Sequence, residues 1–488
     1  MDIVDLDVEG VGIGSLEGRA FAISGVIPGE QVEIRVQEES RGQQRAELIR
    51  VLRPSTRRVT ARCRHAGVCG GCSWQHIAYA EQLKLKREGL QRRLAASLGQ
   101  ATPRVDPTIG MHEPSRGSKA PQVGTTIGMH ELDDDGAPVS GHDPSAPWNF
   151  RHKVSFVFGP GPRGRSLVMG HYGRGSNAIV PAEECPVHAE AGNTLAFTVR
   201  DALVAAGVPG ASADGQRGVA RHLVVRVAHN RRELMATLVV TANDRALRGA
   251  VRRIVNGAGA PDGLHLNIHE RPGPFLFGRT TRKLHGCDRL REEVASVTFL
   301  VSPTAFFQTN VRAAEILVEL VVGAISDRPS RRVLDLYAGA GLFALPLARR
   351  GHQVTAVEEN AEAVSDGLAS QQFSQIPGNA CRFVRGRVEE VLREGARGGL
   401  RGSRPDVVVL DPPRAGCPQQ VLRALAGELR PPRIIYVSCN PDTLARDLAV
   451  AVRAGYLIER VQPVDMFPHT AHIESVALLT RCQSEPAP

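Results

Sequence analysis

The spacing of apolar and polar residues divides the chain into three regions. From about residue 302 onward, short continuous apolar runs alternate with stretches of helical periodicity, which predicts an α/β domain on a doubly wound parallel sheet. Between Trp148 and about residue 300, runs such as Glu233–Val240 predict a β-rich, mixed α+β domain. Short apolar runs broken by glycines near the N-terminus predict a small β-barrel of the OB type. The expected domains are residues 1–53, 54–300 and 301–488.

One helix is predicted from about Tyr79 to Leu98, because leucines recur on one face and Lys and Arg occupy the other. We expect this helix to pack on the C-terminal domain. Residues 101–147 are rich in Pro, Gly, Ser and Asp, and they carry the hexapeptide Thr108–Glu113 again as Thr126–Glu131. Two copies do not make a repeat fold, and so polar a segment buries too little surface to order itself. We therefore expect a disordered insertion here.

Composition excludes several classes of protein. No run of about 18 or more apolar residues is present to predict a membrane span, and the acidic N-terminus lacks the apolar core of a secretory signal. Nine cysteines are too few and too uneven for a disulfide scaffold. We expect a cytoplasmic protein with no membrane partner. Sixty Lys and Arg against 51 Asp and Glu give a net charge of +9, which permits a polyanionic partner without requiring one.

A strand, a glycine turn and a helix follow one another in the C-terminal region. The apolar run Arg331–Tyr337 leads into the turn Ala338–Gly341, and the next strand ends in Glu358. Glycines let the backbone approach a ligand at a helix N-terminus, and an acid at the second strand end suits the ribose of a nucleoside cofactor. This spacing fits NAD and S-adenosylmethionine (SAM) equally. A further strand ending in Asp411-Pro-Pro-Arg414 favours SAM, because amino-methyltransferases often use a similar turn.

A cysteine and a glutamate lie at the ends of two more apolar runs. Arg433–Val437 leads into Ser438-Cys-Asn-Pro441, which places the Cys439 thiol at the carboxyl edge of the sheet, where ligands bind in open α/β folds. Glu474 opens the run Ser475–Leu479. A thiol is the most nucleophilic side chain near neutral pH, and a carboxylate can serve as a base. We predict a catalytic pair rather than a buried cysteine and a surface acid.

Three further cysteines cluster as Cys63-x5-Cys69-Gly-Gly-Cys72. The glycines permit the backbone to fold around a metal, and Cys185 is the best candidate for a fourth ligand. Ligation by thiolates alone suits either zinc or a [4Fe–4S] cluster, and the spacing leaves both open. The remaining cysteines are expected to be ordinary thiols: Cys287, Cys381, Cys417 and Cys482.

Taken together, five motifs resemble those of the SAM-dependent RNA uracil-5-methyltransferases, the enzymes that make 5-methyluridine. The motifs are Phe306–Asn310, Asp335–Gly341, Asp411–Gly416, Ser438–Asp447 and Asp465–Glu474. The resemblance covers nearly the whole chain except residues 101–147. It implies a Rossmann-like class I methyltransferase domain preceded by a TRAM domain, which is an OB-like RNA-binding module.

The resemblance also implies roles for single residues. It implies Cys439 as nucleophile and Glu474 as base. Contacts to SAM are implied for Gln308, Tyr337, Glu358 and Asp411. Leu342 replaces an Asn that contacts the cofactor in some members, and that contact is not assigned here. The cysteine pattern resembles that of the iron–sulfur members, which favours a [4Fe–4S] cluster over zinc. Its ligands would be Cys63, Cys69, Cys72 and Cys185.

The chemistry expected of such an enzyme constrains its substrate. C5 of uracil becomes nucleophilic only after a thiolate adds to C6, so the target base must leave its stack to reach the thiol. A TRAM-like domain with a cysteine cluster resembles the ribosomal-RNA branch of the family, so 23S rRNA is favoured over tRNA as the substrate. We expect the enzyme to act as a monomer. A cytosine methyltransferase is disfavoured by Asp411–Arg414 and His472–Glu474. A non-catalytic RNA-binding protein is disfavoured by the intact Cys439 and Glu474.

Overall fold

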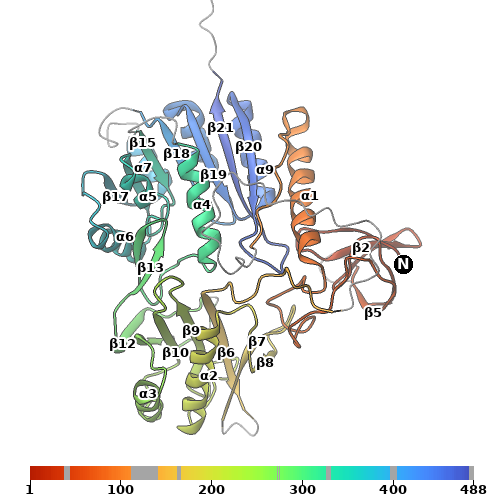
Figure 1. Ribbon diagram of the computed structural model, residues 1–488, viewed down its shortest axis with the longest axis vertical. Helices are drawn as coiled ribbons and strands as arrows, with labels where there is room; N and C mark the ends of the chain where they lie inside the picture. Colours follow the sequence, from red (N-terminus) through yellow and green to blue (C-terminus); the bar gives the residue numbers. More distant parts are fainter. Residues whose placement is uncertain are drawn as a thin grey trace, which may run out of the picture.

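The computed structural model contains an N-terminal β region, a central β-rich domain and a C-terminal α/β domain (Figure 1). The structure describes residues 1–37, 44–111, 141–161, 166–271, 273, 275–325, 331–395 and 404–482. Within these ranges, none of the helices has the length and apolar character that a membrane span requires.

The N-terminal region consists of two antiparallel ladders around a small core. Its strands are β1 (Ile3–Leu6), β2 (Gly12–Leu16), β3 (Arg19–Ile23), β4 (Gln31–Val36) and β5 (Ala46–Arg53). β1, β2 and β3 form one ladder and β4 and β5 the other, and a bridge from Ala22 to Arg45 joins them. Ile3, Phe21, Ile23 and Val32 fill the core between them. The assignment of this region as a TRAM domain stays a prediction.

The central domain is built on a seven-stranded sheet in the order β12-β11-β10-β9-β6-β7-β8. Its strands are β6 (Lys153–Pro160), β7 (Leu167–Tyr172), β8 (Ile179–Pro181), β9 (Ala220–Val227), β10 (Leu234–Val240), β11 (Gly263–Ile268) and β12 (Thr280–Gly286). The helices α2 (Glu190–Ala205) and α3 (Leu247–Asn256) cover one face, where Leu195, Val199 and Ile254 pack on the strands. Figure 1 shows this domain below the α/β domain.

The C-terminal domain has a second seven-stranded sheet, in the order β17-β16-β15-β18-β19-β21-β20. Its strands are β15 (Arg332–Leu336), β16 (Gln353–Glu358), β17 (Cys381–Arg385), β18 (Val407–Leu410), β19 (Arg433–Ser438), β20 (Tyr456–Val464) and β21 (Glu474–Arg481). The five strands β15–β19 are parallel, as expected, but β21 runs antiparallel to both β19 and β20. The predicted parallel sheet therefore carries one reversed strand at this edge.

Helices cover both faces of this sheet because successive side chains of a strand point to opposite sides. The helices of the domain are α4 (Val311–Gly323), α5 (Ala344–Arg349), α6 (Ala361–Phe373), α7 (Val388–Gly395), α8 (Gln419–Arg423) and α9 (Pro441–Arg453). Val333 faces α4 and α5 together with the hairpin of β13 (Leu290–Val294) and β14 (Val297–Val301), whereas Leu334 faces α7, α8 and α9.

The helix expected from Tyr79 to Leu98 is present with those bounds as α1 (Tyr79–Leu98). Leu90 and Leu94 bury their side chains with Leu444 and Leu448 of α9, so this helix lies against the α/β domain (Figure 1). Lys86 is also fully buried there.

The prediction that residues 101–147 form a disordered insertion is wrong at both ends of this segment. Val105 and Ile109 form bridges to Val461 and Val464 at the edge strand β20, and Val105 is fully buried. The first copy of the hexapeptide therefore begins inside the folded structure, as far as Met111. At the other end, Ala146 is buried. Residues 112–140, with the second copy of the hexapeptide, lie outside the described residues.

Candidate active site and its family

The structure brings Cys439 and Glu474 together at one edge of the α/β sheet. Cys439 follows the last residue of β19, and Glu474 is the first residue of β21. Ser438 pairs with Ser475 in the antiparallel register. Cys439, one residue after Ser438, therefore lies beside Glu474, one residue before Ser475. Cys439 is half-buried and Glu474 is buried. The thiol is thus accessible, whereas the carboxyl is shielded from water.

Burial and two acids hold the Cys439 thiol in its neutral form. Burial, Glu474 and Asp411 raise the pKa of Cys439 to about 11, and Arg414 lowers it. Burial and the charge of Asp411 raise the pKa of Glu474 well above its usual range, again opposed by Arg414. Burial alone raises the pKa of Asp411 to about 7. The arrangement collects three proton-binding groups around one cation, which is typical of sites that move protons.

Arg414 is tied to both strand ends of the site. Its Nη2 lies 2.8 Å from Nδ1 of His472, two residues before Glu474. Its carbonyl oxygen accepts hydrogen bonds from Asn440 Nδ2 at 2.9 Å and Thr443 Oγ1 at 3.3 Å, just after Cys439. Burial lowers the pKa of His472 to about 4, so the ring is neutral and can accept from the guanidinium. The sequence analysis gave neither Arg414 nor His472 a role of its own.

A turn suited to a nucleoside cofactor lies at the carboxyl ends of β15 and β16. Tyr337, Gly339 and Gly341 all have positive φ, at +65°, +56° and +87°. The Glu358 carboxylate accepts hydrogen bonds from Gly339 N at 2.9 Å and Asn360 N at 2.7 Å, which fixes the acid beside the turn. The turn continues to α5, which begins at Ala344.

Two buried polar side chains at this turn fit a polar ligand. The Tyr337 hydroxyl is buried and finds no hydrogen-bond partner among the described residues. Asp335 is fully buried inside β15, and burial followed by the charge of Asp411 raises its pKa well above the usual range. The sequence analysis gave Asp335 no role of its own. An acid inside an otherwise apolar strand was the available signal.

Asp411 lies where the cofactor turn meets the cysteine. Its charge acts on Asp335 on one side and on Cys439 and Glu474 on the other. Gln308 is half-buried in the segment that leads into α4, and no hydrogen bond joins it to the other predicted cofactor ligands among the described residues. Two residues later, Asn310 caps α4 through Ala313 N at 3.2 Å and donates to Met466 O at 3.1 Å.

All four candidate metal ligands border one cavity. Cys63, Cys69, Cys72 and Cys185 line a space of about 290 Å³ at the sheet of the central domain. Among the described residues, no three His, Cys, Asp or Glu side chains form a group that could hold a metal ion. The structure thus places the four thiols around a common space.

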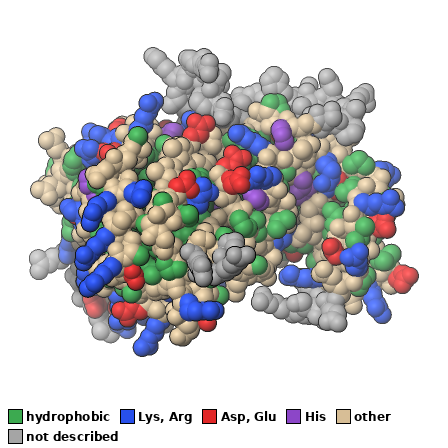
Figure 2. Space-filling view, turned by 90° about the horizontal axis from the view of Figure 1, so that it is seen from below, with side chains coloured by type: hydrophobic (Ala, Val, Ile, Leu, Met, Phe, Trp, Pro, Cys, Tyr) green, Lys and Arg blue, Asp and Glu red, His purple; other side chains and the backbone are tan. Residues whose placement is uncertain are grey.

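A second cavity, of about 160 Å³, opens at the catalytic edge. Cys439, Arg414 and His472 border it together with Trp74 and Arg93 of the chain that leads into and along α1. Residues 6–9 of the N-terminal β region border the same cavity. Figure 2 shows the molecule from below the view of Figure 1, and on that face Lys and Arg side chains are interspersed with acidic and apolar ones.

Comparisons with known proteins agree on one family. The model of the tRNA (Uracil-5-)-methyltransferase family matches residues 288–482. An uncharacterized RNA methyltransferase of Caldanaerobacter subterraneus is 32% identical over 99% of this chain and 97% of its own. Another, of Gloeobacter violaceus, is 33% identical over 98% of this chain and 95% of its own. The chain belongs to the SAM-dependent RNA uracil-5-methyltransferase family.

The fold of the methyltransferase agrees with that of a solved structure. The tRNA (uracil-54, C5)-methyltransferase of Pyrococcus abyssi, in complex with S-adenosyl-L-homocysteine, superposes with a TM-score of 0.71 and 24% identity, covering 98% of each chain. The class I methyltransferase fold predicted from the sequence is thereby confirmed. The protein is an enzyme of the EC 2.1.1 class that uses SAM and acts on RNA.

Proposed function

We propose that the methyltransferase converts a uridine in RNA to 5-methyluridine with Cys439 as nucleophile and Glu474 as base. The observation that carries this proposal is their position on adjacent ends of β19 and β21, with Asp411 and Arg414 beside them. A thiol and a buried carboxyl at the carboxyl edge of the sheet provide one nucleophile and one proton acceptor within a single site.

The reaction balances with these two groups. The Cys439 thiolate forms a bond to C6 of uracil, and the C5–C6 π electrons move toward C5 and O4. C5 then attacks the methyl carbon of SAM, whose sulfur–carbon bond breaks to leave S-adenosylhomocysteine. The Glu474 carboxylate removes the remaining C5 proton, and the C6–sulfur bond breaks to return the thiolate. Because this thiol has a pKa of about 11, the nearby Arg414 is the group that favours its ionised form.

SAM supplies the methyl group, and residues of the glycine turn would hold it. Tyr337 and Glu358 flank the turn, and Asp411 lies between the turn and Cys439. Asp411 is therefore placed to contact either the cofactor or the uracil. The uracil itself has to be rotated out of its stack to reach a half-buried thiol.

We propose that the cysteine cavity holds a [4Fe–4S] cluster. What supports this proposal is the donor set, because four thiols border one cavity of about 290 Å³ and thiolates are the ligands that such a cluster takes. The resemblance of the cysteine pattern to that of the iron–sulfur members favours the cluster over zinc. Methyl transfer moves no electrons, so the role we propose for it is structural.

Iron and acid-labile sulfide measurements on anaerobically purified protein test the cluster directly. We expect both elements in the wild type and their loss in Cys72→Ser. Cys287→Ser serves as the matched control, because Cys287 lies outside the cavity, and it should retain them. Zinc in place of iron, or unchanged iron in Cys72→Ser, would contradict the cluster.

The RNA substrate we propose is 23S rRNA. The cysteine cavity and the N-terminal β region favour the rRNA branch, whereas the matching family model and the solved structure from Pyrococcus abyssi carry the name of tRNA enzymes. A tRNA is therefore the second candidate. Unmodified 23S rRNA and tRNA transcripts, each incubated with enzyme and methyl-labelled SAM, separate the two. Label in 5-methyluridine from rRNA alone supports the first, and label from tRNA alone supports the second.

A further inference from the structure

The loop 465–473 connects β20 to β21 and ends at the proposed base. Val464 and Glu474 are opposite each other in the β20–β21 ladder, so the loop leaves and re-enters the sheet at the catalytic edge. The backbone of this loop therefore sets where Glu474 begins. The ladder places Glu474 beside Cys439, and an element that fixes the loop directly before Glu474 helps to orient its carboxyl.

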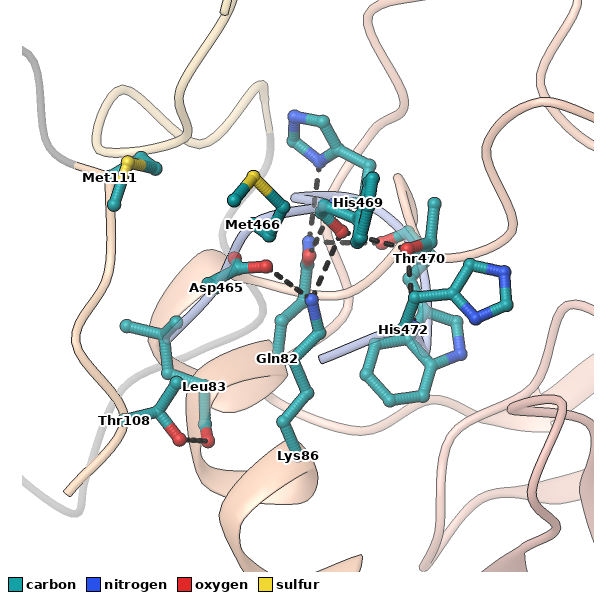
Figure 3. Close-up of polar contacts among 12 residues, drawn as sticks. Gln82, Leu83, Lys86, Thr108, Met111, Asp465, Met466, His469, Thr470 and His472 are labelled. Atoms are coloured by element: carbon teal, nitrogen blue, oxygen red, sulfur yellow. Dashed lines mark hydrogen bonds and ion pairs between the residues drawn. The ribbon is translucent and has the colours of Figure 1, made fainter. Parts of the chain in front are cut away.

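Helix α1, from a region of the chain almost 400 residues earlier, holds the start of this loop. Lys86 Nζ donates to Asp465 Oδ1 at 2.5 Å and to Phe467 O at 3.0 Å (Figure 3). The side chains of Lys86 and Asp465 are both fully buried. Charge-assisted hydrogen bonds in such surroundings are strong and directional, so the first residues of the loop are fixed to the helix.

One turn earlier on α1, Gln82 holds the middle of the loop. Its Oε1 accepts a hydrogen bond from His469 N at 2.9 Å, while the backbone N of Trp74 donates to His469 O at 2.9 Å. The Gln82 side-chain amide donates in turn to Ile77 O at 2.9 Å. The backbone N–H of His469 is thus paired with Gln82 of α1, as Figure 3 shows, and its carbonyl oxygen is paired with Trp74, which precedes the helix.

His469 needs this support because its backbone is in the left-handed region, with φ at +64°. That conformation is uncommon for a residue with a side chain and persists where its surroundings determine it. The ring stacks on Trp148 at 4.3 Å between centroids, and Nε2 lies 2.9 Å from Pro147 O. Burial lowers the pKa of His469 to about 4, so the ring acts as a neutral packing and hydrogen-bonding group.

The held loop continues directly to the reacting groups. Thr470 Oγ1 donates to Phe467 O at 2.8 Å and accepts from His472 N at 3.3 Å. His472 in turn contacts Arg414, whose charge acts on both Cys439 and Glu474. Contacts therefore run without interruption from α1 to the catalytic edge.

We propose that Gln82 and Lys86 are positioning residues for Glu474, and that α1 is part of the machinery for the last step of the reaction. This inference rests on the proposed function. Among the described residues, neither side chain hydrogen-bonds to Cys439 or Glu474. Their role is to hold the loop so that the carboxyl meets the C5 proton of the methylated adduct. Loss of this hold displaces Glu474 more than Cys439, because Cys439 is carried by β19 and Arg414 stays tied through its carbonyl oxygen to Asn440 and Thr443. We therefore expect it to impair proton removal more than thiol addition.

The variant Gln82→Met tests the proposal, with Gln91→Met as the matched control. Gln91 lies on the same helix and also makes two amide hydrogen bonds to backbone, to Pro103 O at 3.0 Å and from Val105 N at 2.8 Å, but these face away from the loop. With the transcript that the wild type methylates, we measure release of 5-methyluridine and the covalent enzyme–RNA adduct on denaturing gels. Thermal melting and S-adenosylhomocysteine binding report on the fold.

We expect Gln82→Met to release product about 10-fold more slowly and to accumulate adduct, with S-adenosylhomocysteine affinity unchanged. Gln91→Met should behave as the wild type. If Gln82→Met does not fold, Gln82→Asn, which keeps the amide one methylene shorter, replaces it with the same expectation. Slow release without adduct, or equal behaviour of the two glutamine variants, overturns the positioning role while leaving the proposed function intact. No 5-methyluridine from the wild type on either transcript overturns both.

Discussion

Glu474 lies beside Cys439 because the strand it opens runs antiparallel to the strand that Cys439 follows. In a wholly parallel sheet, the first residue of β21 would lie at the opposite edge, about a strand length from the thiol. The single reversed strand therefore brings an amino end to the edge where the carboxyl ends gather. This places the buried Glu474 carboxyl next to the Cys439 thiol.

Replacing the proposed base should separate the first steps of the reaction from the last. In Glu474→Gln the thiolate can still add and the methyl group can still transfer, but the C5 proton is not removed. We expect release of 5-methyluridine to fall at least about 100-fold and a methylated covalent adduct to accumulate on denaturing gels. Glu459→Gln, at an exposed position of β20, is the control. Full turnover in Glu474→Gln would rule out this carboxyl as the base.

The rate of adduct formation should rise with pH. The Cys439 thiol has a pKa of about 11 in the folded protein, so below that value its thiolate fraction increases about tenfold for each pH unit. We expect the rate to climb between pH 7 and pH 9, measured by quenched-flow trapping of adduct. A flat profile would mean that the thiol is already ionised at pH 7.

Removing the Arg414 charge should shift that profile toward higher pH. Arg414 lowers the pKa of both Cys439 and Glu474, so Arg414→Gln raises the thiol pKa further and slows adduct formation at a given pH by about 10-fold. Arg423→Gln, on an exposed position of α8, controls for loss of surface charge in RNA binding. Equal slowing in both variants would assign the effect to RNA affinity instead.

Replacing Glu358 should weaken the binding of SAM and leave the binding of RNA unchanged. Its carboxylate is fixed beside the glycine turn by Gly339 N and Asn360 N, where it can accept from ribose hydroxyls. We expect Glu358→Gln to weaken SAM binding about 10-fold in calorimetry, with RNA affinity retained. The control is Glu359→Gln, at the exposed neighbouring position. This variant should bind SAM normally. Unchanged affinity in Glu358→Gln would remove Glu358 from the cofactor site.

Removing one partner of the buried ion pair between Lys86 and Asp465 should destabilise the folded protein. Lys86→Met leaves the Asp465 carboxylate buried without its cation, and we expect the free energy of unfolding to fall by about 3–5 kcal/mol. The double variant Lys86→Met/Asp465→Leu should recover much of that loss, since apolar replacement of a buried ion pair is often neutral. Urea unfolding measures both. A single variant as stable as the wild type would show that the pair is not desolvated as the structure places it.

Local sequence patterns predicted those parts of the fold that depend on local rules. The leucine spacing of α1 gave its bounds, and short apolar runs predicted the strands β15, β16 and β18, the last two followed or ended by an acid. The direction of β21 could not be read in the same way, because an apolar strand has the same pattern in either direction. The position of Glu474 beside Cys439 is therefore given by the register of β19 and β21 and not by the sequence pattern.

The edge contacts of residues 101–111 were missed for a related reason. A segment rich in Pro and Gly looks unable to bury surface, yet Val105 and Ile109 need only a sheet edge to pair with, and β20 provides one. The contact of Lys86 with Asp465 was equally hidden, because 379 residues separate the two in sequence. Composition does not reveal partners that tertiary structure brings from so far away.

The central claim is that this protein makes 5-methyluridine in RNA through a bond from Cys439 to the base. The most direct test incubates wild type and Cys439→Ala with methyl-labelled SAM and unmodified 23S rRNA or tRNA transcripts, followed by digestion to nucleosides and mass spectrometry. We predict label in 5-methyluridine from one transcript with the wild type and none with Cys439→Ala. Label in any other nucleoside, or 5-methyluridine formed by Cys439→Ala, would contradict the account.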